Sequence, residues 1–487
     1  MAKLKEFGKF LRENQSVRRT ILKNTFWLSF GEIVGRILRA AVIIYAARVL
    51  GAEGFGIFSY VLGLAGLLTI FSDLGMAPVV VREGAKDPSL RARYFSTALG
   101  LSFVLAAMST AIIILGTPLI TKFPISQALI VLIALVFVFD LFRGLAGSAI
   151  FRASEKMERE AAVNIFTQLV LVIAGFFLIT KLKTPESLAL SYAVGSAGGL
   201  LLALYLTRHY IRSFLSRFDP SLIKPMLAAS IPMSLTAILG AVMINTDTVL
   251  LGWMRTATDV GFFAAAQKPI LLLYIVPSFI AAAIFPSLAR FARNNPENFR
   301  LLTEKSLSAV LLIGLPLVAG RILTTKEVVE LLYGSEYLPS INAMKILALT
   351  IITMFPMSML TNGIFAYNEQ KFLIKIGAVG VVLNAALDLI LIPVWGIVGC
   401  ALATLFVQAV TSMLVWRKMH QLNSFSVLPS LKKIILATLV MSISVYVLLS
   451  VGAPVLLVVL LATIVYLGLL FLLKETLFKD LRAILAS

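Results

Sequence analysis

The chain has 487 residues, of which 59% are hydrophobic and only 14% are charged, and its net charge is +19. Since a soluble protein carries about 25% charged residues, this composition excludes an ordinary soluble enzyme and predicts an all-α polytopic membrane protein. The basic excess then follows from the positive-inside rule, so we expect no nucleic-acid partner. One cysteine and two histidines exclude an internal disulfide and argue against a Cys/His metal site.

The first 23 residues have the pattern of an amphipathic helix that lies on the membrane surface, with Leu4 and Phe7 on one side and Lys5 and Lys9 on another. Apolar segments follow, each close to the ~20 residues that a helix needs to cross a bilayer. We predict about 14 transmembrane helices, at 24–50, 54–80, 94–119, 125–151, 160–181, 186–207, 226–254, 258–286, 299–320, 340–366, 371–393, 396–416, 429–450 and 453–473.

The span 24–50 carries three charged residues near its middle, Glu32, Arg36 and Arg39. One charge at that depth costs about 2.5–3.5 kcal/mol on insertion scales. On a helix the three side chains fall within an arc of roughly 60°. One hypothesis is that Arg36 and Arg39 face a cavity and contact substrate, while Glu32 neutralises them or couples to a proton. The alternative is a salt-bridge network that fixes the fold, because Glu32 and Arg36 can pair at i,i+4.

Glycine and proline mark two further features of the spans. Gly31 and Gly35 form a GxxxG pair beside the charged face, which predicts close packing of a second helix. Pro232 lies inside the span 226–254, and with Gly240 it is our candidate hinge for a rocking motion. A static kink fits the same pattern.

Basic residues alternate between the predicted loops. With the N-terminus inside the cell, most of the 43 Lys and Arg residues fall on cytoplasmic loops and the two termini. If the number of spans were wrong by one, basic residues would no longer alternate between the two sides of the membrane. The alternation therefore indicates an even number of spans, and we predict a protein of the cytoplasmic membrane with both termini in the cytoplasm. The outer loops hold only Arg48, Lys122, Lys181, Lys183, Arg255, Arg321 and Lys326.

The longest break between spans is 208–225. Ile211, Phe214 and Phe218 follow helical spacing there, with Arg212 beside them. This pattern predicts a helix on the cytoplasmic surface that joins two halves of the chain.

A weak internal repeat supports the two halves. A shift of 205 residues places Ser29 on Ser234 and Gly56 on Gly261. Transporters are commonly built from such repeats, with the substrate site between them. We therefore predict a surface helix at 1–23, a six-span lobe at 24–207, the linker 208–225, a second six-span lobe at 226–419, and a last helix pair with the C-terminus at 420–487.

Further charged residues lie within predicted spans. Asp140 and Arg143 are spaced i,i+3, so they can form an ion pair with each other. The alternative is that Arg143 faces a cavity and Asp140 holds it in place. Lys268 either extends to a nearby interface or, if it lies deeper in the bilayer, needs a cavity. Asp247 either pairs with Lys268 across helices or binds a coupling cation. Asp388 lies closer to a span end, which favours a cap or an interfacial residue.

Two segments resemble a known family. The run ARVLGAEGFGIFSYVLGLAGLLTIFSDLGMAPVVVREGAK (Ala47–Lys86) resembles the first-hairpin signature of polysaccharide flippases. These are the Wzx-type O-antigen translocases of the multidrug/oligosaccharidyl-lipid/polysaccharide superfamily. The run INTDTVLLGWMRTATDVGFFAAAQK (Ile244–Lys268) resembles the matching stretch in their second half.

The resemblance implies two six-helix lobes in a V-shaped, inverted or pseudo-repeat arrangement, plus a C-terminal helix pair, which work by alternating access. The substrate would be an oligosaccharide on a polyprenyl pyrophosphate, moved from the inner to the outer leaflet for cell-surface polysaccharide (O-antigen) biosynthesis. Fixed cations would bind its phosphates, and our candidates are Arg36, Arg39, Arg143 and Lys268. We expect a monomer in functional contact with polysaccharide assembly enzymes, without a cofactor.

No P-loop motif is present in the sequence, so transport would need another energy source, such as Na⁺ or H⁺ coupling. A cation-coupled multidrug exporter of the same fold and a lipid II-type peptidoglycan precursor flippase are the alternatives. A membrane glycosyltransferase or polymerase would need acidic catalytic residues on sizeable loops, so we expect no enzyme. A non-transporting scaffold would leave the charges in the spans unexplained.

Overall fold

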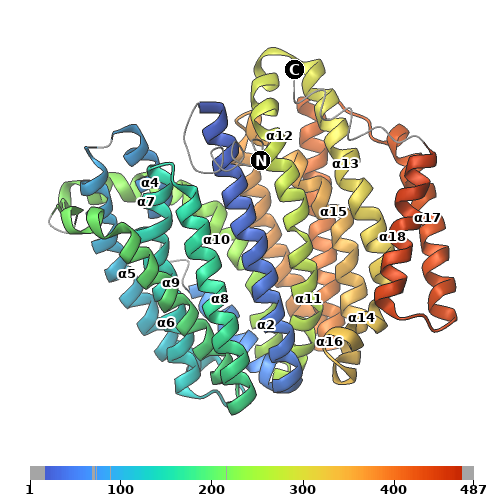
Figure 1. Ribbon diagram of the computed structural model, residues 1–487, viewed down its shortest axis with the longest axis horizontal. Helices are drawn as coiled ribbons and strands as arrows, with labels where there is room; N and C mark the ends of the chain where they lie inside the picture. The colour runs from blue at the N-terminus through green and yellow to red at the C-terminus, as the bar shows by residue number, and fades with distance from the viewer. Residues whose placement is uncertain (1–16, 69–71, 73, 88, 215–216, 474–487) are drawn as a thin grey trace, which may run out of the picture. The chain divides into compact units, whose positions relative to one another are not determined.

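A computed structural model describes residues 17–68, 72, 74–87, 89–214 and 217–473. Within these residues the chain is helical and contains no strand (Figure 1). Eleven helical segments of the described chain are long and apolar enough to cross a membrane. The chain is therefore an all-α multi-pass membrane protein, while the number of fourteen spans stays a prediction. Most of the predicted surface helix at 1–23 lies outside the described residues.

The chain forms two compact units, Met1–Gly261 (unit 1) and Phe262–Ser487 (unit 2). The limits of the predicted lobes differ from these and stay a prediction. Unit 1 contains α2 (Val17–Leu68), α4 (Met76–Lys86), α5 (Arg91–Ile120), α6 (Gln127–Arg143), η1 (Gly144–Ala149), α7 (Ile150–Ala153), α8 (Met157–Leu182), α9 (Pro185–Phe214), η2 (Pro220–Leu222), α10 (Ile223–Met254) and the start of α11 (Ala257–Leu273).

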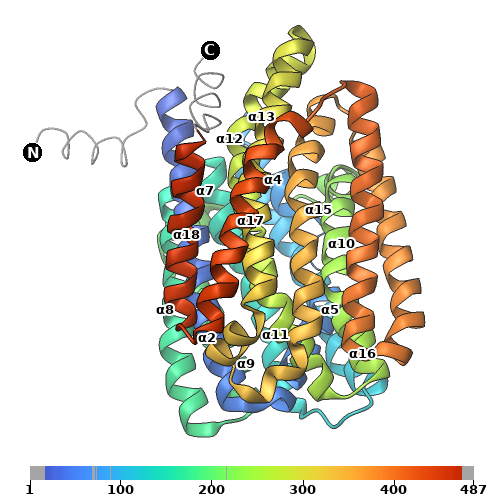
Figure 2. The same cartoon turned by 90° about the vertical axis from the view of Figure 1, so that its right-hand side faces the viewer.

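Unit 2 continues with helices that pack around α15 and α13. The C-terminal pair α17 and α18 packs on α13 through an apolar cluster that includes Leu312, Met441 and Val458 (Figure 2). Tyr466 of α18 also donates a hydrogen bond to the Leu312 carbonyl at 2.6 Å. The helices are α12 (Ile275–Asn294), α13 (Pro296–Leu323), α14 (Thr325–Leu332), η3 (Ser335–Ser340), α15 (Ile341–Ala366), α16 (Gln370–Leu422), α17 (Leu428–Ser450) and α18 (Val455–Leu472).

Two of the long helices are pairs joined at a glycine. Gly51 in α2 has φ 68°, and Gly396 in α16 has φ 55°. Glycine adopts this left-handed region without the steric cost that other residues meet. Gly51 lies in the predicted break between the spans 24–50 and 54–80, and Gly396 is the first residue of the predicted span 396–416.

The helix bounds show the internal repeat more clearly than the residues do. A shift of 205 residues carries residue 52, which follows the kink glycine of α2, onto Ala257, the first residue of α11. The same shift carries Arg91, the first residue of α5, onto Pro296, the first residue of α13. The repeat is therefore visible at two helix starts in each half.

Repeat-related glycines contact one another's backbone within unit 1. A Cβ on Gly56 would lie 2.8 Å from Gly261 N and would overlap the Ala257 carbonyl oxygen. Reciprocally, a Cβ on Gly261 would lie 2.8 Å from the Ala52 carbonyl carbon and would overlap its oxygen. The 205-residue shift relates Ala52 to Ala257, so the contact is pseudo-symmetric. Backbone atoms cannot rotate away, so only glycine permits this approach.

The predicted surface helix at 208–225 is wrong in the described residues. Helix α9 continues to Phe214, and the turn Pro220–Leu222 then leads directly into α10. The Asp219 side chain accepts a hydrogen bond from Ser221 N at 2.9 Å and forms an ion pair with Arg93 of α5. These contacts start a new turn and fasten the linker to α5.

The pseudo-symmetric glycine contact predicts a stability effect. Gly56→Ala places a Cβ against backbone atoms, so we expect a lower melting temperature of the purified protein, with a loss of about 1–3 kcal/mol or more from overpacking. Gly116→Ala is the matched control, because a Cβ there meets nothing within 4 Å. Equal melting temperatures for the two variants would contradict the contact.

The linker contact predicts a pH dependence. Hydrogen bonds from Ser221 and the Arg93 side chain lower the pKa of Asp219 from 3.8 to about 2. Because the folded pKa is the lower one, the contact stabilises above the unfolded pKa and is lost as pH falls from about 4 to about 2. Near neutral pH we expect faster hydrogen exchange at 217–222 in Asp219→Asn than in the wild type, and a smaller difference over that acid range.

Asp87→Asn provides the control for that measurement. Asp87 also accepts a hydrogen bond from a residue two positions later, Ser89, at 2.8 Å. Its loss should leave exchange at 217–222 unchanged. If Asp219→Asn and Asp87→Asn show the same amide hydrogen exchange at 217–222, Asp219 does not fasten the linker to α5.

Candidate functional site: a charge network in unit 1

Glu32 and Arg36 form an ion pair on the first segment of α2. Arg36 Nε donates to Glu32 Oε1 at 2.7 Å, in the predicted i,i+4 geometry. The side chains of Arg36 and Glu32 remain 43% and 46% exposed. Charges at membrane depth generally face water or a polar partner rather than lipid. The pair thus neutralises itself while both groups stay accessible.

Helix α8 packs against the GxxxG pair of α2, as the sequence predicts. A Cβ on Gly31 would lie 2.9 Å from Ala161 Cα, and one on Gly35 would lie 3.3 Å from Asn164 Nδ2. Asn164 also donates a hydrogen bond to the Gly31 carbonyl at 3.2 Å. This close approach brings polar side chains of α8 next to the charged face of α2.

Arg39 has a neutral partner. Its Nε donates to Gln168 Oε1 of α8 at 3.3 Å. Gln168 is buried, whereas Arg39 is exposed and forms no ion pair within the described part of the chain. An amide does not cancel the guanidinium charge, and the remaining N–H groups of Arg39 can bind an anion.

Asp140 and Arg143 of α6 form the self-satisfied pair that the sequence offers as one alternative. Arg143 Nη2 lies 3.0 Å from Asp140 Oδ1, and the Arg143 side chain is only 17% exposed. Arg143 packs against α9, where a Cβ on Gly199 would lie 2.9 Å from its Cδ. Buried Tyr192 of α9 interacts electrostatically with both Arg39 and Asp140. A substrate role for Arg143 stays a prediction.

Arg152 extends these charges toward the end of α7. It forms an ion pair with Glu160 at 2.7 Å and also interacts electrostatically with Glu32. Sequence reasoning missed Arg152, Glu160 and Gln168. The spacing of Asn164 and Gln168, i,i+4 in an apolar span, was the signal that could have indicated a polar face on α8. We name the whole set the unit-1 charge network: Glu32, Arg36, Arg39, Asp140, Arg143, Arg152 and Glu160.

The other predicted site residues lie on other helices. Lys268 is half-buried on α11 in unit 2, and Asp247 is buried on α10 in unit 1. Their pairing stays a prediction. Helix α10 runs without interruption through Pro232 and Gly240. A Cβ on Gly240 would meet nothing within 4 Å, so the hinge also stays a prediction.

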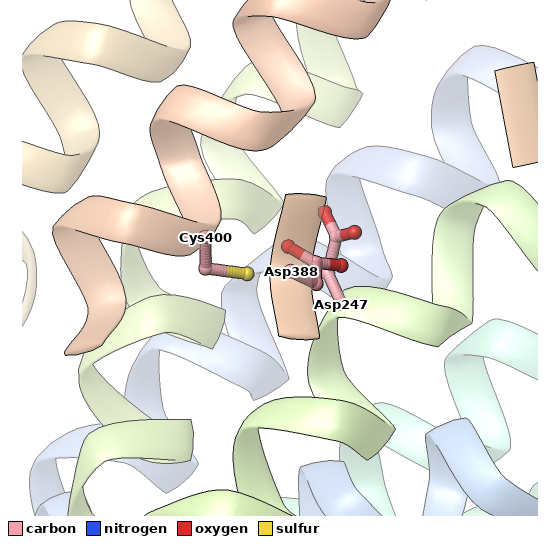
Figure 3. A group of neighbouring side chains, drawn as sticks. All are labelled: Asp247, Asp388 and Cys400. Carbon is pink, nitrogen blue, oxygen red and sulfur yellow. The ribbon is translucent and has the colours of Figure 1, made fainter. Parts of the chain in front are cut away.

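Unit 2 contains a buried carboxylate, Asp388 of α16, that sequence reasoning placed wrongly. It is 0% exposed, so it is neither a cap nor an interfacial residue. Asn384 donates to its Oδ2 at 3.4 Å. A carboxylate oxygen of Asp388 lies within 4.8 Å of Cys400 Sγ, across the kink of α16 (Figure 3). Position along a span does not reveal which face of a helix is covered, so the sequence could not predict this burial.

Membrane helices, repeated halves and charges within the spans define a polytopic membrane transporter. Residues 21–292 match the family described as "Polysaccharide biosynthesis protein". Because this match covers more than half of the chain, the protein belongs to that family.

Similar proteins of known name are flippases and transporters. The chain is 24% identical to a probable low-salt glycan biosynthesis flippase of Haloferax volcanii, over 83% of this chain and 84% of that protein. It is 26% identical to a putative O-antigen transporter of Shigella flexneri, over 79% of this chain and 94% of that protein. These relatives confirm the family resemblance and the expectation that the protein is not an enzyme.

Solved structures confirm the fold. A lipid II flippase in an inward closed conformation superposes with a TM-score of 0.76 at 17% identity, covering 93% of this chain and 99% of that one. An inward-facing multidrug transporter superposes with a TM-score of 0.60 at 14% identity, covering 81% of this chain and 95% of that one. Sequence identities this low establish the fold and leave the substrate to the residues of this chain.

The Glu32–Arg36 pair predicts a coupled stability effect. Glu32→Gln alone leaves Arg36 without its carboxylate, and Arg36→Gln alone leaves Glu32 without its guanidinium. We expect each single variant to lower the melting temperature and the double variant to recover most of the loss. The coupling should be about 0.5 kcal/mol for an accessible i,i+4 pair. Strictly additive changes in unfolding free energy would show that the pair does not stabilise the fold.

Proposed function

We propose that the protein is a flippase for an oligosaccharide linked to polyprenyl pyrophosphate. Its family, the names of its relatives and its membrane helices support this class of transporter. The observation that carries the proposal is Arg39, an exposed guanidinium in the middle of the predicted span 24–50 whose partner is an amide. Such a cation needs an anion, and pyrophosphate is the charged part of the proposed substrate.

The chemistry of Arg39 suits this head group. A guanidinium can donate two parallel hydrogen bonds to phosphate oxygens and keeps its charge at any physiological pH. Arg36 lies about one turn away and is accessible, although Glu32 shares its charge. The lipid chain can stay in the bilayer while Arg39 and Arg36 hold the head group. Arg143 and Lys268 remain secondary candidates for the same role.

The charge balance argues against the multidrug alternative. The unit-1 charge network has four arginines and three carboxylates, so its formal charge is positive. Cationic drugs would require a net acidic site. A lipid II-type precursor also carries a polyprenyl pyrophosphate, so the network fits that substrate as well, and transport of defined substrates separates the two.

We further propose that the protein lies in the cytoplasmic membrane with both termini inside, and that it exports the glycan lipid to the outer leaflet. The distribution of Lys and Arg over the predicted loops supports this orientation. An ion gradient would supply the energy, with Asp247 and Asp388 as the buried carboxylates that could respond to Na⁺ or H⁺. Export would feed assembly of a surface polysaccharide.

Leaflet-resolved transport in proteoliposomes tests the function. The probes are a fluorescent polyprenyl-pyrophosphate oligosaccharide and fluorescent lipid II, each with and without a sodium or proton gradient. We expect Arg39→Ala to slow transport about 10- to 100-fold, because a hydrogen bond to a charged group contributes about 1.5–3 kcal/mol. Arg39→Lys should retain intermediate activity, since lysine keeps the charge without the bidentate geometry.

Lys181→Ala is the matched control, because it removes one cation at the outer end of α8, where Lys181 lies over the Phe177 ring. It should transport at the wild-type rate. Wild-type rates for a folded Arg39→Ala variant would refute the role of Arg39. Absence of transport of both lipids by the wild-type protein under every gradient would refute the flippase itself.

A further inference from the structure

A cavity of about 490 Å³ lies in unit 1 between α5, α6 and α9, and no step of the proposed transport uses it. Its volume is within the 300–1,000 Å³ typical of ligand pockets. Four phenylalanine rings, Phe95, Phe103, Phe142 and Phe218, form much of its wall, and among the described residues Ser96 is the one polar side chain in that wall. Such a wall suits a hydrocarbon chain.

The cavity opens sideways toward the lipid. Phe103 at its lip is 66% exposed, and Val104, Met108 and Leu115 of the same helix are also exposed. The Phe103 ring lies 6.4 Å from that of Phe142. Large apolar side chains exposed on a membrane span face lipid tails, so a chain can pass from the bilayer into the cavity at Phe103.

The linker between α9 and α10 supplies the wall at the other end. A Cβ on Gly100 would lie 2.9 Å from Phe218 Cε2, so the ring rests directly on α5. The next residue, Asp219, is tied to Arg93 by an ion pair and donates its backbone N–H to Thr97 Oγ1 at 3.1 Å. These contacts hold Phe218 in the cavity wall.

Arginines surround this end of the cavity, which we call its mouth. Arg93 precedes the cavity-lining residue Ser96 by one turn of α5, and Arg208 follows the lining residue Leu204 by one turn of α9. Arg217 stands directly before Phe218, and all three arginines are exposed. One acid, Asp219, opposes them, so the mouth keeps a positive charge that attracts phosphate.

We propose that the cavity binds an acyl chain of an anionic phospholipid, with the phosphate of that lipid at the arginines of the mouth. The cavity and the charge network lie on different faces of α6 and α9, because consecutive residues of a helix point about 100° apart. Phe142 lines the cavity, whereas its neighbour Arg143 pairs with Asp140. Leu200 lines the cavity, whereas Gly199 packs against Arg143. A glycan lipid held by the network would therefore have its head on the other face of these helices.

The bound phospholipid packs against the cavity-lining faces of α6 and α9, the helices whose other faces contact the unit-1 charge network, and it holds Phe218 in place. It thereby acts as a structural ligand of unit 1 and does not itself undergo transport. This role is independent of the proposed flippase function, because lipid binding is measured without transport.

Native mass spectrometry of the full-length protein in detergent tests the site, with phosphatidylglycerol and phosphatidylcholine as probes. Leu200→Trp fills the cavity, and we expect about tenfold weaker phosphatidylglycerol binding. Leu201→Trp is the matched control, because Leu201 is 67% exposed on the same helix and lies outside the wall. The double variant Arg208→Gln/Arg217→Gln should lose the preference for phosphatidylglycerol over phosphatidylcholine, as should high salt.

A folded Leu200→Trp variant that keeps wild-type phosphatidylglycerol binding would overturn the proposal. Should that variant fail to fold, wild-type protein is labelled with phosphatidylglycerol carrying a photoreactive group at the chain end. Labels at 95–103 and 200–204 support the site, and labels confined to other segments overturn it. Preferential labelling of those two segments by a photoreactive polyprenyl phosphate, with displacement of phosphatidylglycerol, would assign the cavity to the carrier lipid and show our choice of ligand to be wrong.

Discussion

The close packing of α2 on α8 is the contact on which the position of Arg39 depends. A charged side chain in a membrane span needs a polar partner or water, and the predicted span 24–50 of α2 carries three charged side chains in two turns. Gly31 and Gly35 remove the side chains that would separate the helices, and α8 places Asn164 and Gln168 in the gap. Without that approach Gln168 could not reach Arg39, and the guanidinium would have no fixed direction.

The partners of the three charges differ, and this difference assigns their roles. Arg36 has a carboxylate on its own helix, so its pairing is local and independent of tertiary structure. Arg39 depends on a residue 129 positions later. An amide orients a guanidinium without neutralising it, which is the arrangement that electrostatic recognition of an anion requires. Arg39 is therefore the better anion-binding group of the two, a distinction that the sequence alone does not make.

Local patterns were sufficient to predict much of this architecture. Span hydropathy, the breaks at Gly51 and Gly396, the GxxxG packing and both short-range ion pairs follow from residues close together in the chain. The linker was predicted wrongly, because the pattern of Phe214 and Phe218 is helical but Asp219 bonds to Ser221 and to Arg93 of a distant helix. Gln168 and Tyr192 were missed, and Asp388 was placed wrongly near a span end, for the related reason that their importance comes from which helix faces meet.

The internal repeat explains why the charges of the first half need not appear in the second. The 205-residue shift relates Glu32, Arg36 and Arg39 to Ala237, Ala241 and Ile244. In the other direction, the shift relates Asp247 of α10 to Val42, a buried residue of α2. Helix starts of the two copies agree at residue 52 with Ala257 and at Arg91 with Pro296, so this part of the backbone pattern has been kept while the charged groups have diverged. Each half can then change its ligand chemistry without disturbing the glycine contact at Gly56 and Gly261, because that contact uses backbone atoms alone.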